Sequence, residues 1–117
     1  LTADEELKNA NEFERISMNK FGLINQIAPR YRSTYFAHIF SGGYSSGYYS
    51  YVHSAVLDSD GFEGFKKTGN VFDPMLAEKL RTNVYEKGST EEAMELYVKF
   101  RGQKPSIEPL LKVRGLD

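Results

Sequence analysis

The chain has 117 residues, enough for one small domain, and its 15 Lys plus Arg nearly balance 16 Asp plus Glu. No basic stripe is present to neutralise a phosphate backbone and no apolar run approaches the ~20 residues that span a bilayer, so we expect neither nucleic acid nor membrane as a partner. The sequence contains no cysteine, which excludes disulfides, thiolate zinc ligands and a cysteine nucleophile.

The first predicted element is a helix that begins near Thr2. Thr2 and Glu5 have the spacing of a capping box, and apolar residues then recur at roughly helical intervals. Gly22 is a candidate break within this run. Pro29 ends it, because a proline ring and its missing N–H do not fit a continuing helix.

An irregular region is predicted to follow. Residues 30–40 alternate aromatic, polar and β-branched side chains, which indicates extended chain or a short irregular helix. Residues 41–47 contain three glycines and three serines. A segment of this composition adopts positive φ readily, so we expect a mobile loop.

The helical pattern returns in the second half of the chain. A helix is expected from Tyr48 to about Lys67, stopped at Gly69. Asp73 followed by Pro74 is a strong start signal for the next helix, which runs to the stop at 87–88.

Two shorter helices are predicted near the C-terminus. Ser89 with Glu92 has capping-box spacing and opens a helix that Pro105 interrupts. A last helix covers residues 107–113 and ends at Gly115. The fold class is therefore all-α, with four to five helices and one glycine-rich loop.

Metal binding by this chain is not expected. The two histidines, His38 and His53, are fifteen residues apart rather than at the i, i+4 spacing of a helical zinc site. The segment from Asp58 through Asp60 to Glu63 has the start of a calcium loop without its later ligands. We interpret these carboxylates as a solvated helical face.

The tyrosines are the most unusual feature of the sequence. Four of the eight fall within residues 44–51. If that stretch is helical, Tyr44, Tyr48 and Tyr51 line one face and Tyr49 turns aside. A neutral phenol both donates and accepts hydrogen bonds, so such a face suits peptide carbonyls or a developing oxyanion. Spacing alone favours simple packing, but the nearness of His38 and the glycine loop favours a site.

Three stretches resemble the thimet oligopeptidase family of zinc peptidases. They are Pro-Arg-Tyr-Arg-Ser-Thr-Tyr-Phe-Ala-His-Ile-Phe-Ser-Gly-Gly-Tyr-Ser-Ser-Gly-Tyr-Tyr-Ser-Tyr at 29–51, Val-Leu-Asp-Ser-Asp-Gly-Phe-Glu-Gly-Phe at 56–65, and Phe-Arg-Gly-Gln-Lys-Pro at 100–105 followed by Leu-Leu-Lys-Val-Arg-Gly-Leu at 110–116. Within that family the similarity is greatest to bacterial peptidyl-dipeptidases, with the oligopeptidase A group second. The resemblance extends over nearly the whole chain.

The resemblance implies a zincin-type helical domain, of which residues 1–117 are a C-terminal segment. It implies that Zn²⁺ and its His-Glu-x-x-His ligands lie upstream, so the isolated chain is expected to be inactive. His38 and Tyr51 are then the catalytic candidates for hydrogen bonding the tetrahedral oxyanion or the adjoining carbonyl. The implied substrate contacts are Tyr44, Tyr48 and, secondarily, Tyr49. The implied hinges are Gly42, Gly43 and Gly47.

Two positions depart from the family pattern. His53 stands where the family usually has tryptophan, and Ser41 stands where related sequences often have a third loop glycine. Dipeptide release also needs a group that reads the substrate's terminal carboxylate, for which Arg30 and Arg32 are candidates.

Two functions are compatible with these patterns. The first is the substrate-binding part of a peptidase, with a peptide and the upstream part of its own catalytic domain as partners. The second is a non-catalytic helical interaction module that binds a peptide or a partner helix through its tyrosine face. Because Leu1 is not Met, we expect a piece of a longer protein, whose exposed core surface favours self-association. A cytoplasmic location is expected, with the periplasm as the alternative.

Overall fold

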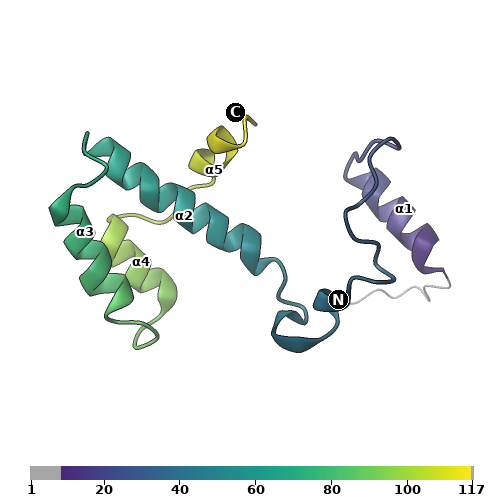
Figure 1. The fold of residues 1–117 in the computed structure, drawn as a ribbon, viewed down its shortest axis with the longest axis horizontal. Helices are drawn as coiled ribbons and strands as arrows, with labels where there is room; N and C mark the ends of the chain where they lie inside the picture. The colour runs from purple at the N-terminus through teal and green to yellow at the C-terminus, as the bar shows by residue number, and fades with distance from the viewer. Residues whose placement is uncertain (1–8, 117) are drawn as a thin grey trace. The chain divides into compact units, whose positions relative to one another are not determined.

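The structure is a computed structural model that describes residues 9–116. These residues form five α-helices and no strand (Figure 1), which confirms the all-α prediction and its helix number. The chain divides into two compact units, Leu1–Tyr48 and Tyr49–Asp117, and each is described by itself. None of the helices within the described residues is long and apolar enough to cross a membrane.

The first unit contains one α-helix, α1 (Ala10–Lys20). The side chain of Asn9 caps it by accepting from the backbone N–H groups of Asn11 (3.0 Å) and Glu12 (3.2 Å). The predicted capping box of Thr2 and Glu5 lies outside the described residues.

Helix α1 ends at Lys20, just before the candidate break at Gly22 and not at Pro29 as predicted. Gly22 adopts a left-handed conformation (φ +77°), and its N–H donates to the carbonyl of Asn19. The N–H of Leu23 donates to the carbonyl of Met18 at 3.1 Å. These two bonds satisfy the last carbonyls of the helix, which is why a glycine ends it well before the proline.

Residues 23–29, predicted to be helical, are irregular. Residues 30–47 are irregular as predicted, apart from two short 3₁₀ turns, η1 (Ala37–Ile39) and η2 (Gly42–Tyr44). Gly42 and Ser46 have positive φ, +70° and +53°. Such angles suit glycine and are uncommon for other residues, so the loop 41–47 turns sharply at two points.

The second unit contains the other four α-helices. They are α2 (Ser50–Lys67), α3 (Pro74–Leu80), α4 (Ala93–Arg101) and α5 (Glu108–Val113), and a π-helical turn, η3 (Arg81–Tyr85), continues α3. The predicted cap of α3 is confirmed, because Oδ1 of Asp73 accepts from the N–H of Leu76 at 2.7 Å. The capping box predicted at Ser89 is wrong, since α4 begins at Ala93 and its N-cap residue is Glu92, whose side chain makes no capping hydrogen bond.

Helix α4 also ends earlier than predicted. Gly102 adopts a left-handed conformation (φ +79°) directly after Arg101, so the helix stops there rather than at Pro105. The end of α5 at Gly115 is confirmed, with the N–H of Leu116 donating to the carbonyl of Leu111 at 3.0 Å.

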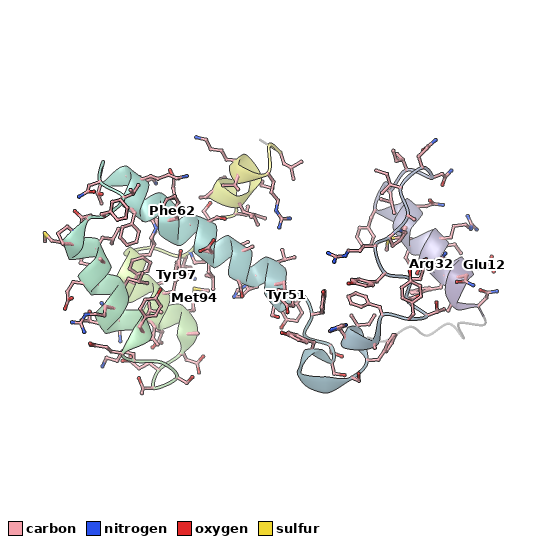
Figure 2. The ribbon with its side chains drawn as sticks, in the orientation of Figure 1. Glu12, Arg32, Tyr51, Phe62, Met94 and Tyr97 are labelled. Carbon is pink, nitrogen blue, oxygen red and sulfur yellow. The ribbon has the colours of Figure 1, made fainter. Side chains whose placement is uncertain are left out.

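The core of the second unit lies between α2, α4 and α5. Its buried apolar side chains are Leu96, Tyr97 and Phe100 on α4 and Leu110 on α5. Helix α2 presents two buried glycines to this core, Gly61 and Gly64. Without a Cβ these positions let side chains of α4 approach the backbone of α2 closely. Figure 2 shows Tyr97 between the two helices.

Candidate functional site

The histidine and two of the predicted tyrosines gather in the first unit. His38 lies on η1, Tyr44 on η2, and Tyr48 is the last residue of the unit. The ring centroid of His38 is 6.2 Å from that of Tyr44 and 5.9 Å from that of Tyr48. The two tyrosine rings are 5.9 Å apart in an edge-to-face arrangement. We call His38, Tyr44 and Tyr48 the aromatic cluster.

The cluster does not have the geometry that a helix would give it. Tyr44 and Tyr48 both lie before α2, and only Tyr51 is within that helix. A single helical face carrying all three tyrosines is therefore wrong. The turn of the glycine loop, not helical spacing, brings Tyr44 and Tyr48 together.

Two further aromatic residues support the cluster from one side. The ring of Phe36 lies 4.7 Å from that of Tyr48, edge to face, and the ring of Tyr31 stacks on Phe36 at 4.8 Å. The guanidinium of Arg30 lies 5.2 Å from the centroid of Tyr31. Sequence reasoning did not assign Tyr31 or Phe36 a role, although the density of aromatic residues just upstream of His38 was a usable signal.

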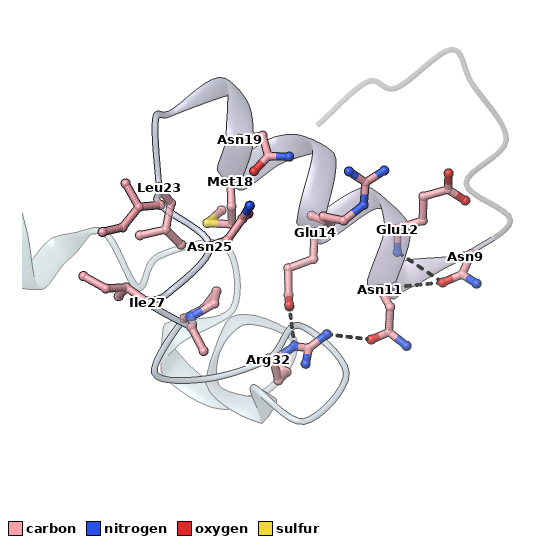
Figure 3. A pocket seen from close by; sticks show the side chains of 14 residues that line it. Asn9, Asn11, Glu12, Glu14, Met18, Asn19, Leu23, Asn25, Ile27 and Arg32 are labelled. Carbon is pink, nitrogen blue, oxygen red and sulfur yellow. Dashed lines mark hydrogen bonds and ion pairs between the residues drawn. The ribbon is translucent and has the colours of Figure 1, made fainter.

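A buried carboxylate holds the segment that leads to this site. Glu14 on α1 is 9% exposed, and its Oε2 accepts from the backbone N–H of Ser33 at 2.7 Å. Its Oε1 pairs with Nε of Arg32, and Nη2 of Arg32 donates to Oδ1 of Asn11 at 3.2 Å (Figure 3). We call Glu14, Arg32 and Ser33 the carboxylate latch.

The latch changes the pKa of Glu14 and occupies the guanidinium of Arg32. The N–H of Ser33, together with the guanidinium of Arg32, lowers the pKa of Glu14 below its usual value. Because the Arg32 guanidinium is occupied by Glu14 and Asn11, it is less suited than Arg30 to read a substrate carboxylate. A hollow of about 560 Å³ opens beside the latch, lined by polar side chains and Met18 of α1 and by most of residues 23–29.

Tyr49 and Tyr51 belong to the second unit, at the start of α2. Tyr49 precedes the first residue of the helix and its side chain is 74% exposed, while Tyr51 lies in the first turn and is 55% exposed. Their proposed roles beside His38 therefore remain predictions.

The predicted hinge glycines differ from one another. Gly42 has the positive φ that favours glycine, whereas Gly43 and Gly47 do not. A Cβ at Gly42 or Gly43 would meet open space. Ser41, the family departure, is extended (φ −142°) and its hydroxyl donates to the carbonyl of Ala37 at 3.2 Å, so this position does not need a glycine backbone.

The second unit contains a polar network that the sequence interpretation missed. Asp60 is 1% exposed, so the solvated-face interpretation is wrong for this carboxylate. Its Oδ2 accepts from the hydroxyl of Tyr97 at 2.6 Å and lies 3.1 Å from Nε of Arg101. Arg101 Nε also donates to the Asp60 carbonyl at 2.9 Å, and the N–H of Ser106 lies 3.4 Å from Oδ1.

The network changes the titration of its phenol. Burial, then the hydrogen bond to Asp60 and its negative charge, raises the pKa of Tyr97 far above its usual value. The signal available in the sequence was the pair of glycines that follow Asp60 on the same helix, which mark a closely packed face. His53, in contrast, is exposed on α2.

Comparison with known proteins identifies the class of protein. Residues 2–116 match peptidase family M3. The chain therefore belongs to this family, which confirms the resemblance found in the sequence.

The individual relatives are longer proteins. A dipeptidyl carboxypeptidase of Salmonella typhimurium is 41% identical over 91 residues, covering 78% of this chain and 13% of the relative. The dipeptidyl carboxypeptidase of Escherichia coli is 36% identical over 118 residues, covering 100% of this chain and 17% of the relative. Oligopeptidase A of Haemophilus influenzae is 40% identical over 69% of this chain and 12% of its own length. The chain thus spans less than one fifth of these relatives.

Proposed function

We propose that this chain is the substrate-binding and transition-state-stabilising part of a zinc metallopeptidase of family M3, and that the enzyme hydrolyses peptide bonds. The observation that carries the proposal is the aromatic cluster, in which an imidazole and two phenols lie about 6 Å apart in a member of a peptidase family. Several hydrogen-bonding side chains on one turn suit an extended peptide, whose carbonyls need donors.

The metal is assigned to other parts of the enzyme. Within residues 9–116 no three His, Asp or Glu side chains converge to hold a metal ion, so these residues do not fit a zinc site. In the proposed enzyme zinc supplies an activated water. What this chain contributes is binding and hydrogen bonding, and without the metal-binding part it is inactive.

His38 and Tyr51 are the proposed oxyanion-stabilising residues. When a peptide bond is attacked, charge accumulates on the carbonyl oxygen, and an imidazole N–H or a phenol O–H directed at that oxygen is worth more in the transition state than in the ground state. Tyr44 and Tyr48 are proposed to contact the substrate as the loop with Gly42, 43 and 47 closes over it, and Tyr49 to be a secondary contact.

Removal of a C-terminal dipeptide is the specific reaction that we propose. Similarity to the relatives named dipeptidyl carboxypeptidase covers 78% and 100% of this chain, against 69% for those named oligopeptidase A. Internal cleavage is the alternative, and analysis of the products by mass spectrometry distinguishes the two. Dipeptides released from the C-terminus of an unstructured peptide support the proposal, whereas internal fragments favour the alternative.

The test of the mechanism is Tyr51→Phe in the complete peptidase. Loss of one oxyanion donor is expected to lower kcat by about 10²–10³-fold with little change in KM. Tyr85→Phe is the control, because it removes a hydroxyl from an exposed ring to which no role in binding or catalysis is assigned, and it is expected to leave kcat nearly unchanged. Equal kcat values for Tyr51→Phe and the wild type, with His38→Ala also active, would contradict the proposed roles.

A further inference from the structure

Glu14 is nearly buried on α1, although it carries a charge and does not belong to the aromatic cluster. A buried carboxylate is unfavourable unless its oxygens accept hydrogen bonds. Here one oxygen accepts from the backbone N–H of Ser33 and the other pairs with Arg32, so both are used by the same short segment. The segment that α1 holds in this way precedes His38 by only a few residues.

A continuous series of contacts joins the latch to the cluster within the first unit. The carbonyl of Arg32 accepts from the N–H groups of Tyr35 and Phe36, both at 3.1 Å, so the latch fixes one end of a turn whose other end is Phe36. The ring of Phe36 contacts Tyr48 at 4.7 Å and lies 6.1 Å from the ring of His38. The latch is therefore connected through Phe36 to two of the three cluster rings, those of His38 and Tyr48.

We propose that Glu14 is a positioning residue, which sets the place of His38 and Tyr48 through its hydrogen bond to the Ser33 backbone and its ion pair with Arg32. This inference rests on the proposed function, because the cluster must act on substrate for its position to matter. The role differs from simple stabilisation, since the latch acts on the geometry of two named rings. Small displacements of catalytic groups are costly for turnover.

The first experiment is Glu14→Gln in the complete peptidase. The glutamine amide keeps the shape but has one acceptor oxygen, and its NH₂ group opposes the N–H groups of Arg32. Active sites are counted by inhibitor titration, so that kcat refers to correctly folded enzyme only. We expect this kcat to fall by about 10- to 100-fold, with KM little changed. Glu12→Gln is the matched control, because it removes the same charge from the same helix outside the latch, and is expected to retain wild-type kcat.

Two further variants separate the parts of the latch. Glu14→Asp keeps both acceptor oxygens on a shorter side chain and is expected to restore part of kcat. The exchange of Glu14→Arg with Arg32→Glu restores opposite charges but offers no acceptor to the Ser33 N–H from position 14. It is expected to remain as impaired as Glu14→Gln. Faster amide hydrogen exchange in residues 31–48 of Glu14→Gln, at unchanged thermal stability, is the matching structural result.

A double-mutant cycle with His38→Ala gives the decisive outcome. If Glu14 acts through His38 and Tyr48, Glu14→Gln lowers kcat clearly less in the His38→Ala background than in the wild type, and almost not at all when Tyr48→Phe is added. Equal losses in both backgrounds, or wild-type kcat for Glu14→Gln, would overturn the inference while leaving the proposed function in place, provided that His38→Ala is impaired. Wild-type kcat for His38→Ala would overturn the proposed function and this inference together.

Discussion

Each unit of the chain contains a helical carboxylate that holds a second segment through hydrogen bonds and an ion pair, but the two carboxylates differ in their surroundings. In the first unit the Glu14 carboxylate accepts from a serine N–H and from the Nε of an arginine. In the second unit the Asp60 carboxylate accepts from a serine N–H and a tyrosine hydroxyl and forms an ion pair with an arginine. Each carboxylate lies on a helix and holds another segment against it. The comparison suggests that a charged group fixes position wherever apolar packing alone does not specify it.

The solvent exposure of each ion pair decides how much its carboxylate contributes to the stability of its unit. The side chains of Asp60 and Arg101 are 2% and 9% exposed, whereas the Arg32 partner of Glu14 is 42% exposed. Water therefore screens the Glu14 pair more than the Asp60 pair. The network in the second unit is the stronger determinant of stability, and the latch in the first unit is the stronger candidate for a role in turnover.

The largest effect is expected from Asp60→Ala. Removing this carboxylate leaves the buried guanidinium of Arg101 without its opposite charge and takes away the charged acceptor of the Tyr97 hydroxyl, although both groups keep a backbone acceptor. Breaking a buried ion pair in this way costs about 3–5 kcal/mol in the free energy of unfolding. Urea denaturation followed by circular dichroism measures it. Asp58→Ala is the control, because Asp58 is exposed on the same helix and its loss is expected to stay within about 0.5 kcal/mol. Equal effects for the two aspartates would show that burial does not distinguish them.

The network also marks the limit of what the sequence could predict. The helix starts at Asp73-Pro74 and the stops at Gly69 and Gly115 were predictable, because capping depends on a few neighbouring residues. The burial of Asp60 depends on Tyr97 and Arg101, about forty residues away, and no periodic pattern connects them. The charged residues next to Asp60 in the sequence therefore favoured the wrong interpretation, in which its carboxylate lies on a solvated helical face.

In the candidate site, too, the residues close together in the sequence were predictable and those with distant partners were not. The motif pointed to His38, Tyr44 and Tyr48 before their rings were known to be close, because the loop that joins them is short. Glu14 could not be found in this way, since its partners lie eighteen and nineteen residues further along the chain. The predicted helical face failed because the positive φ values at Gly42 and Ser46 turn the chain before α2 begins.

A smaller effect is expected from Tyr97→Phe, and it depends on pH. Loss of a hydrogen bond to a charged acceptor costs about 1.5–3 kcal/mol near neutral pH. Because the pKa of Tyr97 is raised in the folded chain, its contribution is complete below the unfolded pKa of about 10 and declines as the pH rises above that value, where only the unfolded chain loses the proton.

The measurement compares urea unfolding of wild type and Tyr97→Phe at neutral pH and above pH ~10. The difference in unfolding free energy between the two proteins is expected to shrink at the higher pH. Tyr85→Phe, whose ring is 72% exposed, controls for the loss of one hydroxyl. A difference that stays constant across this range would contradict the proposed link between the phenol and Asp60.

The smallest effects come from the two buried glycines of α2, and they are expected to have opposite signs. A Cβ at Gly61 would lie 3.5 Å from Cε1 of Phe100, an ordinary contact, so Gly61→Ala gains helix stability of about 0.5–1 kcal/mol. A Cβ at Gly64 would lie 3.1 Å from Nε of Arg101, which Asp60 holds in place. Gly64→Ala must displace that guanidinium and is expected to lose about 1 kcal/mol net. Stabilisation by both substitutions in urea denaturation would mean that Arg101 moves freely, and the network would then not be the rigid element that distinguishes the second unit.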